Sequence, residues 1–165
     1  MNGVEVIPMG KSHLDAAADL EKACFSQPWS RRGLEEELEN PLAFFYIALL
    51  DGKTAGYAGM HCVAGEAYVT NVAVFPQFRR RGAGRALTEK LVATAEREGC
   101  SFLSLEVRAS NGVAISLYQS LGFQEEGRRK HFYASPQEDA VIMTRRFPAE
   151  QVKGGLTNGR SKKGE

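Results

Sequence analysis

The sequence predicts an α/β fold in which helices flank a mixed, mostly antiparallel sheet. Apolar and alternating runs typical of strands fill residues 43–75, and a helical stripe separates them from another strand-like run at 102–107. Hydrophobic residues make up 43% of the 165 residues and charged residues 25%, as in a soluble globular protein. The length fits one domain, which we place at residues 1–147. Residues 148–165, rich in glycine and lysine, are expected to form a disordered basic tail.

The N-terminal region predicts one strand and two helices. Val4 and Val6 alternate with polar neighbours, which favours a short strand. Ser12 opens a capping-box pattern, so a helix is predicted from there to about Ala23. A Pro-Trp pair then breaks the chain, and Ser30 is placed to cap a second helix that runs through Glu39.

Three strands in succession predict an antiparallel meander. Ala43–Leu50 is apolar on both faces of an extended chain and is shorter than a typical helix, so it is interpreted as a buried strand. Asp51-Gly52 is a strong hairpin signal, and Thr54–Val63 is the returning strand. After the Ala64-Gly65 turn, Glu66–Phe75 is rich in residues that favour strands.

A crossover and a C-terminal hairpin complete the predicted fold. Apolar residues recur at helical spacing from Gly84 to Ala95, and Gly99 ends that helix. The following strand, Phe102–Val107, is expected to lie parallel to the strand before the helix. The remaining predicted elements are a helix and two strands, at Gly112–Leu121, Gln124–Tyr133 and Ala140–Arg146.

Charge and hydropathy argue against several classes of function. The net charge of +1 gives no overall reason to expect binding to nucleic acid or to an anionic membrane. No apolar run approaches the roughly 18 residues that a membrane span needs. The N-terminus lacks a basic stretch followed by an apolar one, so no secretory signal is expected. We therefore expect a cytoplasmic protein with neither a membrane nor nucleic acid as a direct partner.

The cysteines and histidines do not predict a disulfide framework or a metal site. Cys24, Cys62 and Cys100 contain no CxxC pair, and an odd number completes no set of disulfides. We expect them to be small buried side chains in a reducing compartment. The three histidines are not spaced as metal ligands, so no metal is expected.

The segment PQFRRRGAGR, residues 76–85, predicts a phosphate-binding bend between a strand and a helix. Its glycines let an anion approach the backbone, and its arginines add charge-assisted hydrogen bonds. The helix N-terminus adds unpaired N–H groups and a positive partial charge. Together these features favour a phosphate or pyrophosphate as the ligand.

Other phosphate sites fit this segment less well. A Walker loop is excluded because the chain has no GxxxxGK[ST] string. A Rossmann fingerprint is disfavoured because Leu87 stands where its third glycine belongs, and because residues 76–81 separate the strand from Gly82. A basic solvated loop remains an alternative. Coenzyme A, which carries a 5′-pyrophosphate, fits better than any of these.

Three residues after the crossover could carry acid–base chemistry. Glu106 lies near the C-terminal end of its predicted strand, on the face opposite the apolar residues. Asn111 is placed to cap the next helix, and Tyr118 follows about two turns into it. From the residues alone, Glu106 could equally be a surface carboxylate paired with Arg108, Asn111 a helix cap only, and Tyr118 a core tyrosine.

The sequence NVAVFPQFRRRGAGRAL resembles the acetyl-CoA-binding segment of the GNAT acetyltransferase superfamily. The order of the predicted elements also matches the GNAT fold. The resemblance implies that backbone groups of Val72, Ala73 and Val74 bind the pantetheine arm. It further implies that the bend holds the pyrophosphate through its own residues: Arg80, Arg81, Gly82, Ala83, Gly84 and Arg85.

SLEVRASNGVAISLYQSLGF resembles the RimI-like, ribosomal-protein-alanine N-acetyltransferase branch of that superfamily. CFSQPWS at residues 24–30 and EDAVIM at 138–143 resemble two further motifs of the branch. The resemblance implies that Glu106 is the proton acceptor, that Asn111 contacts acetyl-CoA and that Tyr118 is the proton donor. Acetyl-CoA would be the co-substrate, without a metal. The acceptor would be the N-terminal alanine of the eighteenth small-subunit ribosomal protein.

Two other functions stay open on the sequence. The chain could be a GNAT enzyme that acetylates another protein N-terminus, a lysine or a small amine such as an antibiotic. It could also be a coenzyme A-binding sensor without catalysis. A sensor would not need both Glu106 and Tyr118.

Overall fold

The computed structural model describes residues 3–148 of the chain. The predicted tail therefore lies outside the described residues, apart from Pro148. The chain divides into two compact units, each discontinuous in sequence. The first comprises Met1–His61 and Val69–Val92, and the second comprises Cys62–Tyr68 and Ala93–Glu165. Each unit is described by itself.

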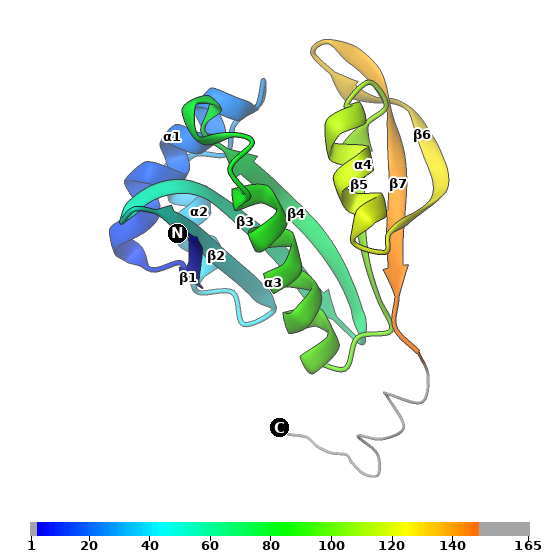
Figure 1. The fold of residues 1–165 in the computed structure, drawn as a ribbon, viewed down its shortest axis with the longest axis horizontal. Coiled ribbons are helices and arrows are strands. Elements are labelled where there is room, and N and C mark those ends of the chain that lie inside the picture. The colour runs from blue at the N-terminus through cyan, green and yellow to red at the C-terminus, as the bar shows by residue number, and fades with distance from the viewer. Residues whose placement is uncertain (1–2, 149–165) are drawn as a thin grey trace. The chain divides into compact units, whose positions relative to one another are not determined.

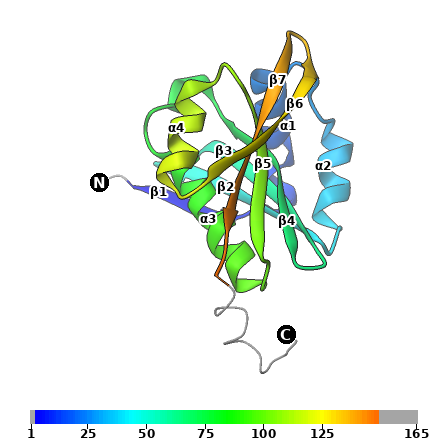
Figure 2. The same ribbon diagram turned by 90° about the vertical axis from the view of Figure 1, so that its right-hand side faces the viewer.

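Strands pair in the order β1-β2-β3-β4-β5-β7-β6 (Figures 1 and 2). The strands are β1 Val4–Pro8, β2 Ala43–Leu50, β3 Lys53–Val63, β4 Glu66–Val74, β5 Phe102–Arg108, β6 Gln124–Ala134 and β7 Gln137–Arg146. The α-helices are α1 Leu14–Cys24, α2 Arg31–Leu38, α3 Ala83–Arg97 and α4 Gly112–Ser120. Two 3-10 turns complete the description, η1 Lys11–His13 and η2 Pro76–Phe78. Every strand and helix predicted from the sequence is confirmed, with ends that differ by a few residues.

Antiparallel strands build the first unit. β1 pairs with β2 from Val4 opposite Leu50 to Pro8 opposite Tyr46. The turn between β2 and β3 has φ of 52° at Asp51 and 78° at Gly52, which is the left-handed conformation that a two-residue hairpin turn of this kind requires. The predicted meander is therefore confirmed at its first hairpin.

Helices α1 and α2 bury their apolar sides in the core of the first unit. Leu14, Leu20 and Leu34 are inaccessible to solvent or nearly so, and they belong to one cluster with Ile47 and Tyr57. Burial of each such side chain contributes roughly 1.5–3 kcal/mol to folding. The cluster thus fixes both helices against the strands of this unit.

The start of α1 differs from the sequence prediction. The chain enters the helix through the 3-10 turn η1, and the N-cap is His13, without a side-chain cap bond. The ring of His13 instead takes part in a local bond, in which the Gly10 N–H donates to Nδ1 at 2.9 Å. The expected capping box at Ser12 was wrong because this turn places the first helical residue at Leu14. Ser30 does cap α2, accepting the N–H of Gly33 at 3.0 Å.

The second unit contains the parallel pair and the C-terminal hairpin. Residues Glu66–Tyr68 of β4 pair in parallel with Phe102–Ser104 of β5, which confirms the predicted crossover. β7 lies antiparallel between β5 and β6. On α4, Tyr118 packs on Phe123 with ring centroids 5.7 Å apart. Among the described residues, no helix is both long and apolar enough to cross a membrane.

Candidate active site

In the first unit, the bend between β4 and α3 has the geometry of an anion site. After Val74 the chain passes through η2, and α3 begins at Ala83. Gly82 has a φ of 93° and Arg80 a φ of 65°, so the backbone turns sharply just before the helix. The first N–H groups of an α-helix point toward its N-terminal end, where the aligned peptide dipoles place a positive partial charge. Backbone and charge there both suit a diphosphate.

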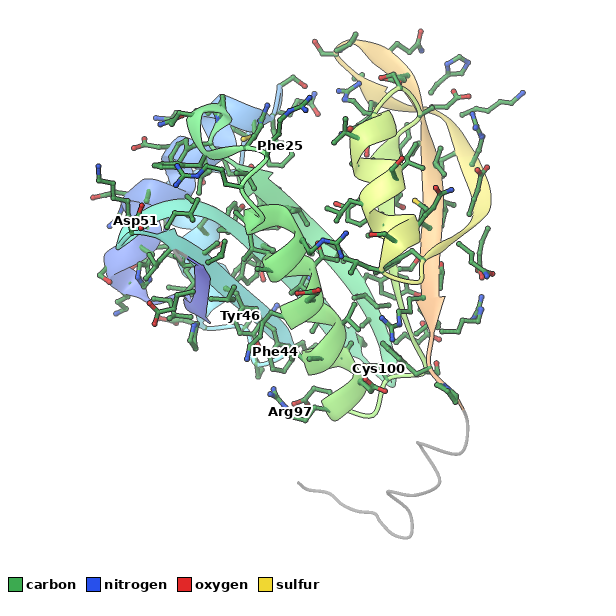
Figure 3. The ribbon with its side chains drawn as sticks, viewed as in Figure 1. Phe25, Phe44, Tyr46, Asp51, Arg97 and Cys100 are labelled. Atoms are coloured by element: carbon green, nitrogen blue, oxygen red, sulfur yellow. The ribbon has the colours of Figure 1, made fainter. Side chains whose placement is uncertain are left out.

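The arginines of the bend have different roles, although the sequence groups them together. Arg79 turns back onto the protein. Its Nε donates to the Val74 carbonyl at 3.1 Å, and its Nη2 lies 3.6 Å from Cys24 Sγ. Arg81 forms a 3.8 Å ion pair with Asp51. Asp51 lies in the turn between β2 and β3 (Figure 3). Arg79 is therefore a structural tie from the bend to β4 and α1.

In the second unit, Glu106 is held by an arginine from a distant strand. Its Oε2 lies 2.9 Å from Nε of Arg129 on β6, and its side chain is 31% exposed. The alternative pairing with Arg108 is wrong, because Arg108 pairs with Glu138 instead. β7 separates β5 from β6, so strand pairing rather than sequence spacing decides which cation meets Glu106.

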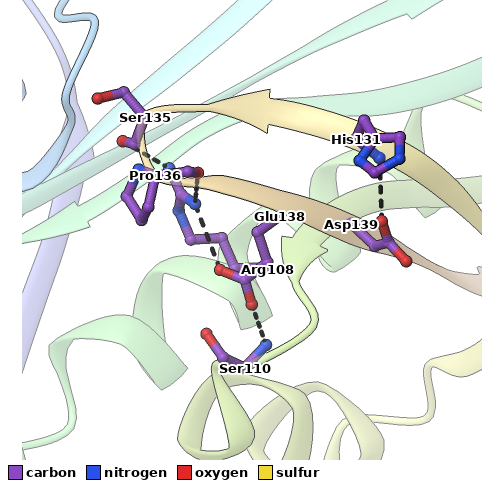
Figure 4. A network of polar contacts seen from close by, with 7 residues as sticks. All are labelled: Arg108, Ser110, His131, Ser135, Pro136, Glu138 and Asp139. Carbon is purple, nitrogen blue, oxygen red and sulfur yellow. Dashed lines mark hydrogen bonds and ion pairs between the residues drawn. The ribbon is translucent and has the colours of Figure 1, made fainter.

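A polar network fixes the loop that leads from β5 into α4 (Figure 4). Glu138 accepts the N–H of Ser110 at 2.5 Å and lies 3.3 Å from Arg108. Arg108 also donates to the carbonyls of Ser135 and Pro136. Donation from Ser110 above all, with help from the Arg108 guanidinium, lowers the pKa of Glu138 against the opposing effect of burial. Asn111 then caps α4, accepting the Ala114 N–H at 3.1 Å.

Tyr118 is almost buried, with 7% of its surface exposed. Burial above all, and then the neighbouring Tyr133, raise the pKa of Tyr118 to about 12. Burial and then the Glu106 carboxylate raise the pKa of Tyr133 in turn. Tyr133 therefore lies within electrostatic range of both Glu106 and Tyr118. Tyr118 is protonated at neutral pH, as any tyrosine is, and its raised pKa extends this hydrogen-bond-donating form to more alkaline pH.

The residues singled out in the sequence fall in two groups. The first unit holds Val72–Val74 and Arg80–Arg85, and the second holds Glu106, Asn111 and Tyr118. Sequence reasoning missed the ion-pair partner of Glu106. It noticed Glu138 only as part of EDAVIM, although that motif was the available signal for the network around Ser110.

Within residues 3–148, no three His, Cys, Asp or Glu side chains gather as metal ligands would. The three cysteines are free thiols, of which Cys100 is buried and Cys24 and Cys62 are half-buried.

Comparison with known proteins identifies the family. Residues 14–123 match the model of the acetyltransferase (GNAT) family. Ribosomal protein bS18-alanine N-acetyltransferase of Escherichia coli strain K12 is 40% identical over 132 residues, 79% of this chain and 88% of the relative. The enzyme of the same name from Salmonella typhimurium strain LT2 is 40% identical over 146 residues, 87% of this chain and 96% of the relative.

A solved structure agrees with the sequence relatives. The crystal structure of the ribosomal-protein-S18-alanine N-acetyltransferase from Escherichia coli has a TM-score of 0.78 and 36% identity, covering 87% of this chain and 93% of that one. The GNAT fold predicted from the sequence is thereby confirmed. The chain belongs to the GNAT acetyltransferase family, in its branch of ribosomal-protein-alanine N-acetyltransferases.

Proposed function

We propose that this protein transfers the acetyl group of acetyl-CoA to the α-amino group of the N-terminal alanine of ribosomal protein bS18. The observation that carries this proposal is the 40% identity to two enzymes named ribosomal protein bS18-alanine N-acetyltransferase, over 88% and 96% of their lengths. The diphosphate-binding geometry at the start of α3 supports the acetyl-CoA half of the reaction.

The first unit would bind acetyl-CoA. The N–H groups of Arg80–Arg85 are directed by the bend and by the start of α3, and we assign the pyrophosphate to them. We assign the pantetheine arm to backbone groups of Val72–Val74. The Val74 carbonyl already accepts hydrogen bonds from Arg79 and Cys24, so the remaining backbone groups of that stretch are the better candidates. The family resemblance assigns a further acetyl-CoA contact to Asn111.

The second unit would supply the acid–base chemistry. Glu106 removes a proton from the α-ammonium, directly or through a water molecule. Because an α-amino group has a pKa of about 7.7–8.0, a carboxylate of modest basicity suffices. Arg129 engages Oε2, so we assign proton acceptance to Oε1. The free amine then attacks the acetyl carbonyl, whose oxygen is polarised by an N–H of Val72–Val74.

The tetrahedral intermediate collapses with cleavage of the carbon–sulfur bond. Tyr118 donates its hydroxyl proton to the departing sulfur, which leaves as coenzyme A thiol. The second proton of the attacking nitrogen is released to solvent as the amide forms, and Tyr118, whose pKa is about 12, regains a proton from solvent. The transfer is direct, and no cysteine forms a covalent intermediate.

The test is a panel assay on the full chain. Purified protein receives acetyl-CoA and peptides that differ in their first residue, together with polyamines and free lysine, and release of coenzyme A is followed. We expect the peptide with the N-terminal sequence of bS18 to be the best acceptor, with mass spectrometry placing the acetyl group on its α-amine. Preference for a polyamine or lysine would contradict the proposal. Coenzyme A binding without any acetylation would favour a sensor.

A further inference from the structure

The first unit contains a buried carboxylate that the mechanism does not use. Glu21 of α1 is 1% exposed, and its three hydrogen-bond partners are neutral. Oε1 accepts the backbone N–H of Trp29 at 2.8 Å. Oε2 accepts Nδ2 of Asn71 at 2.8 Å and the hydroxyl of Tyr57. Burial, followed by the bond to Glu21, raises the pKa of Tyr57, which keeps this hydroxyl a donor.

A carboxylate in such a place is costly unless every oxygen is well satisfied. Removing a carboxylate from water is among the most unfavourable steps in folding, and charge-assisted hydrogen bonds offset it only with good geometry. A close-packed apolar side chain at position 21 would avoid that cost.

The partners of Glu21 come from three different parts of the first unit. Tyr57 lies on β3, and Trp29 belongs to the segment between α1 and α2. Asn71 lies on β4, directly before the Val72–Val74 stretch to which we assign the acetyl-CoA contact. The Trp29 ring packs on Phe45, with centroids 6.4 Å apart, so that segment is held by its ring as well as by its backbone.

Asn71 depends on Glu21 for its orientation. Its Nδ2 is bonded to Glu21, whereas its buried Oδ1 has no hydrogen-bond partner. An amide whose oxygen is unsatisfied could turn over if its single strong acceptor were lost. Because Asn71 adjoins Val72, the Glu21 bond also restrains the backbone at the start of the assigned stretch.

We propose that Glu21 is a positioning residue for acetyl transfer, which acts through Asn71 to hold the backbone of Val72–Val74 in register with the acetyl carbonyl. This inference rests on the proposed function, since it needs acetyl-CoA on that stretch of β4. Displacement of a reacting group by about 1 Å can cost roughly 100-fold in rate, so a restraint within three residues of the polarising N–H should affect catalysis and not only folding.

Four variants separate positioning from general stability. Glu21→Ala removes all three bonds, and Asn71→Ala removes only the one that leads to β4. Tyr57→Phe is the matched control, because it removes a bond to the same carboxylate while Phe can keep the stacking on Phe45 that Tyr57 shows. Glu21→Gln is the conservative variant. Its oxygen can still accept from Trp29, and once the side-chain amide of Asn71 turns over, its own amide can donate to Oδ1 of Asn71.

The readouts are kcat and KM, measured well below each variant's melting temperature. We expect Glu21→Ala and Asn71→Ala each to lower kcat by about 10- to 100-fold, and the double variant to lose little more than either single one. Glu21→Gln should recover most of the loss, and Tyr57→Phe should keep kcat within about twofold. If kcat of folded Glu21→Ala equals that of the wild type, the carboxylate is merely structural. If Glu21→Gln is as slow as Glu21→Ala, the charge matters rather than positioning.

A second readout does not require an acceptor. Acetyl-CoA should shift the backbone amide resonances of Val72–Val74 by similar amounts in the wild type and in Tyr57→Phe. In Glu21→Ala and Asn71→Ala the same resonances should shift less. A wild-type protein that acetylates nothing would overturn the proposed function, whereas identical amide shifts in all four variants would overturn the role of Glu21.

Discussion

The candidate functional groups of the two units are of different kinds. In the first, the candidate cofactor contacts are backbone N–H groups presented by a sharp bend and by the start of α3. In the second, the candidate catalytic groups are the side chains of Glu106 and Tyr118, and Glu106 is held by Arg129 from another strand. The comparison shows that substitutions should act through chain conformation in the first unit and through individual side chains in the second.

The largest expected effect is that of Glu106→Gln. Loss of the proton acceptor should lower kcat/KM by about 10²- to 10⁴-fold at neutral pH, with little change in the affinity for acetyl-CoA. Steady-state kinetics and calorimetric binding would check this. Glu125→Gln, an exposed carboxylate of the same unit that pairs with Arg128, is the control and should keep the wild-type rate. A near-normal rate for Glu106→Gln would remove it from the base role.

The second-largest effect on the rate is expected for Tyr118→Phe. Loss of the donor to sulfur should lower kcat by about 10- to 100-fold, whereas exposed Tyr68→Phe should leave it unchanged. If Tyr118→Phe turned over like the wild type, another group would have to meet the departing sulfur.

The same Tyr118 variant should alter the alkaline limb of stability. Its pKa is about 10 when unfolded and about 12 when folded, so its contribution is complete below pH 10 and is lost as the pH rises through about 12. The full difference amounts to roughly 2–3 kcal/mol. Denaturant titrations between pH 9 and about 12 should show a shallower decline for Tyr118→Phe than for the wild type.

Gly82→Ala tests the first unit through its backbone. At a φ of 93° a side chain is strained, so the bend should shift and KM for acetyl-CoA should rise by about tenfold. Gly99→Ala is the control, because Gly99 also has a positive φ, of 79°, but ends α3 in the second unit. It should lose comparable stability with an unchanged KM. Equal rises in KM for both variants would mean that only general destabilisation is at work.

The smallest effect is expected for Glu138→Gln, which weakens the hold on Ser110 and Arg108. The rate should fall by a few-fold, since Asn111 would be less well placed. Because the pKa of Glu138 is lowered on folding, its contribution is present above the ordinary carboxyl pKa and is lost as the pH falls below it. The variant's melting temperature should therefore depend less on pH in the acid range. An unchanged acid limb would show that the network around Ser110 is not stabilising.

Local signals in the sequence predicted local structure well. Asp51-Gly52, Ser30 and Asn111 each act on backbone groups within three residues, and each behaves as predicted. The Ser12 prediction failed because a competing turn, with its own bond between Gly10 and His13, shifted the start of the helix.

Long-range partners could not be predicted in this way. The pairing of Glu106 with Arg129 depends on β7 lying between their strands. The bond between Glu21 and Asn71 joins residues 50 positions apart. Neither has a signature in spacing. The bend at residues 79–85 was recognisable because its glycines and arginines are contiguous, although contiguity did not reveal that Arg79 faces the protein.

The contact of Cys24 with both the Val74 carbonyl and Arg79 bears on how thiol reagents would affect this enzyme. Alkylation of this half-buried sulfur would push Arg79 away and distort the bend, and activity would fall although no cysteine takes part in the proposed mechanism. Acetyl-CoA bound at the bend, as proposed, would slow the labelling by restraining Arg79 beside the sulfur. Inactivation by a maleimide, with protection by acetyl-CoA, is also the result expected of a catalytic cysteine. Retained activity of Cys24→Ser would show that Cys24 is not catalytic.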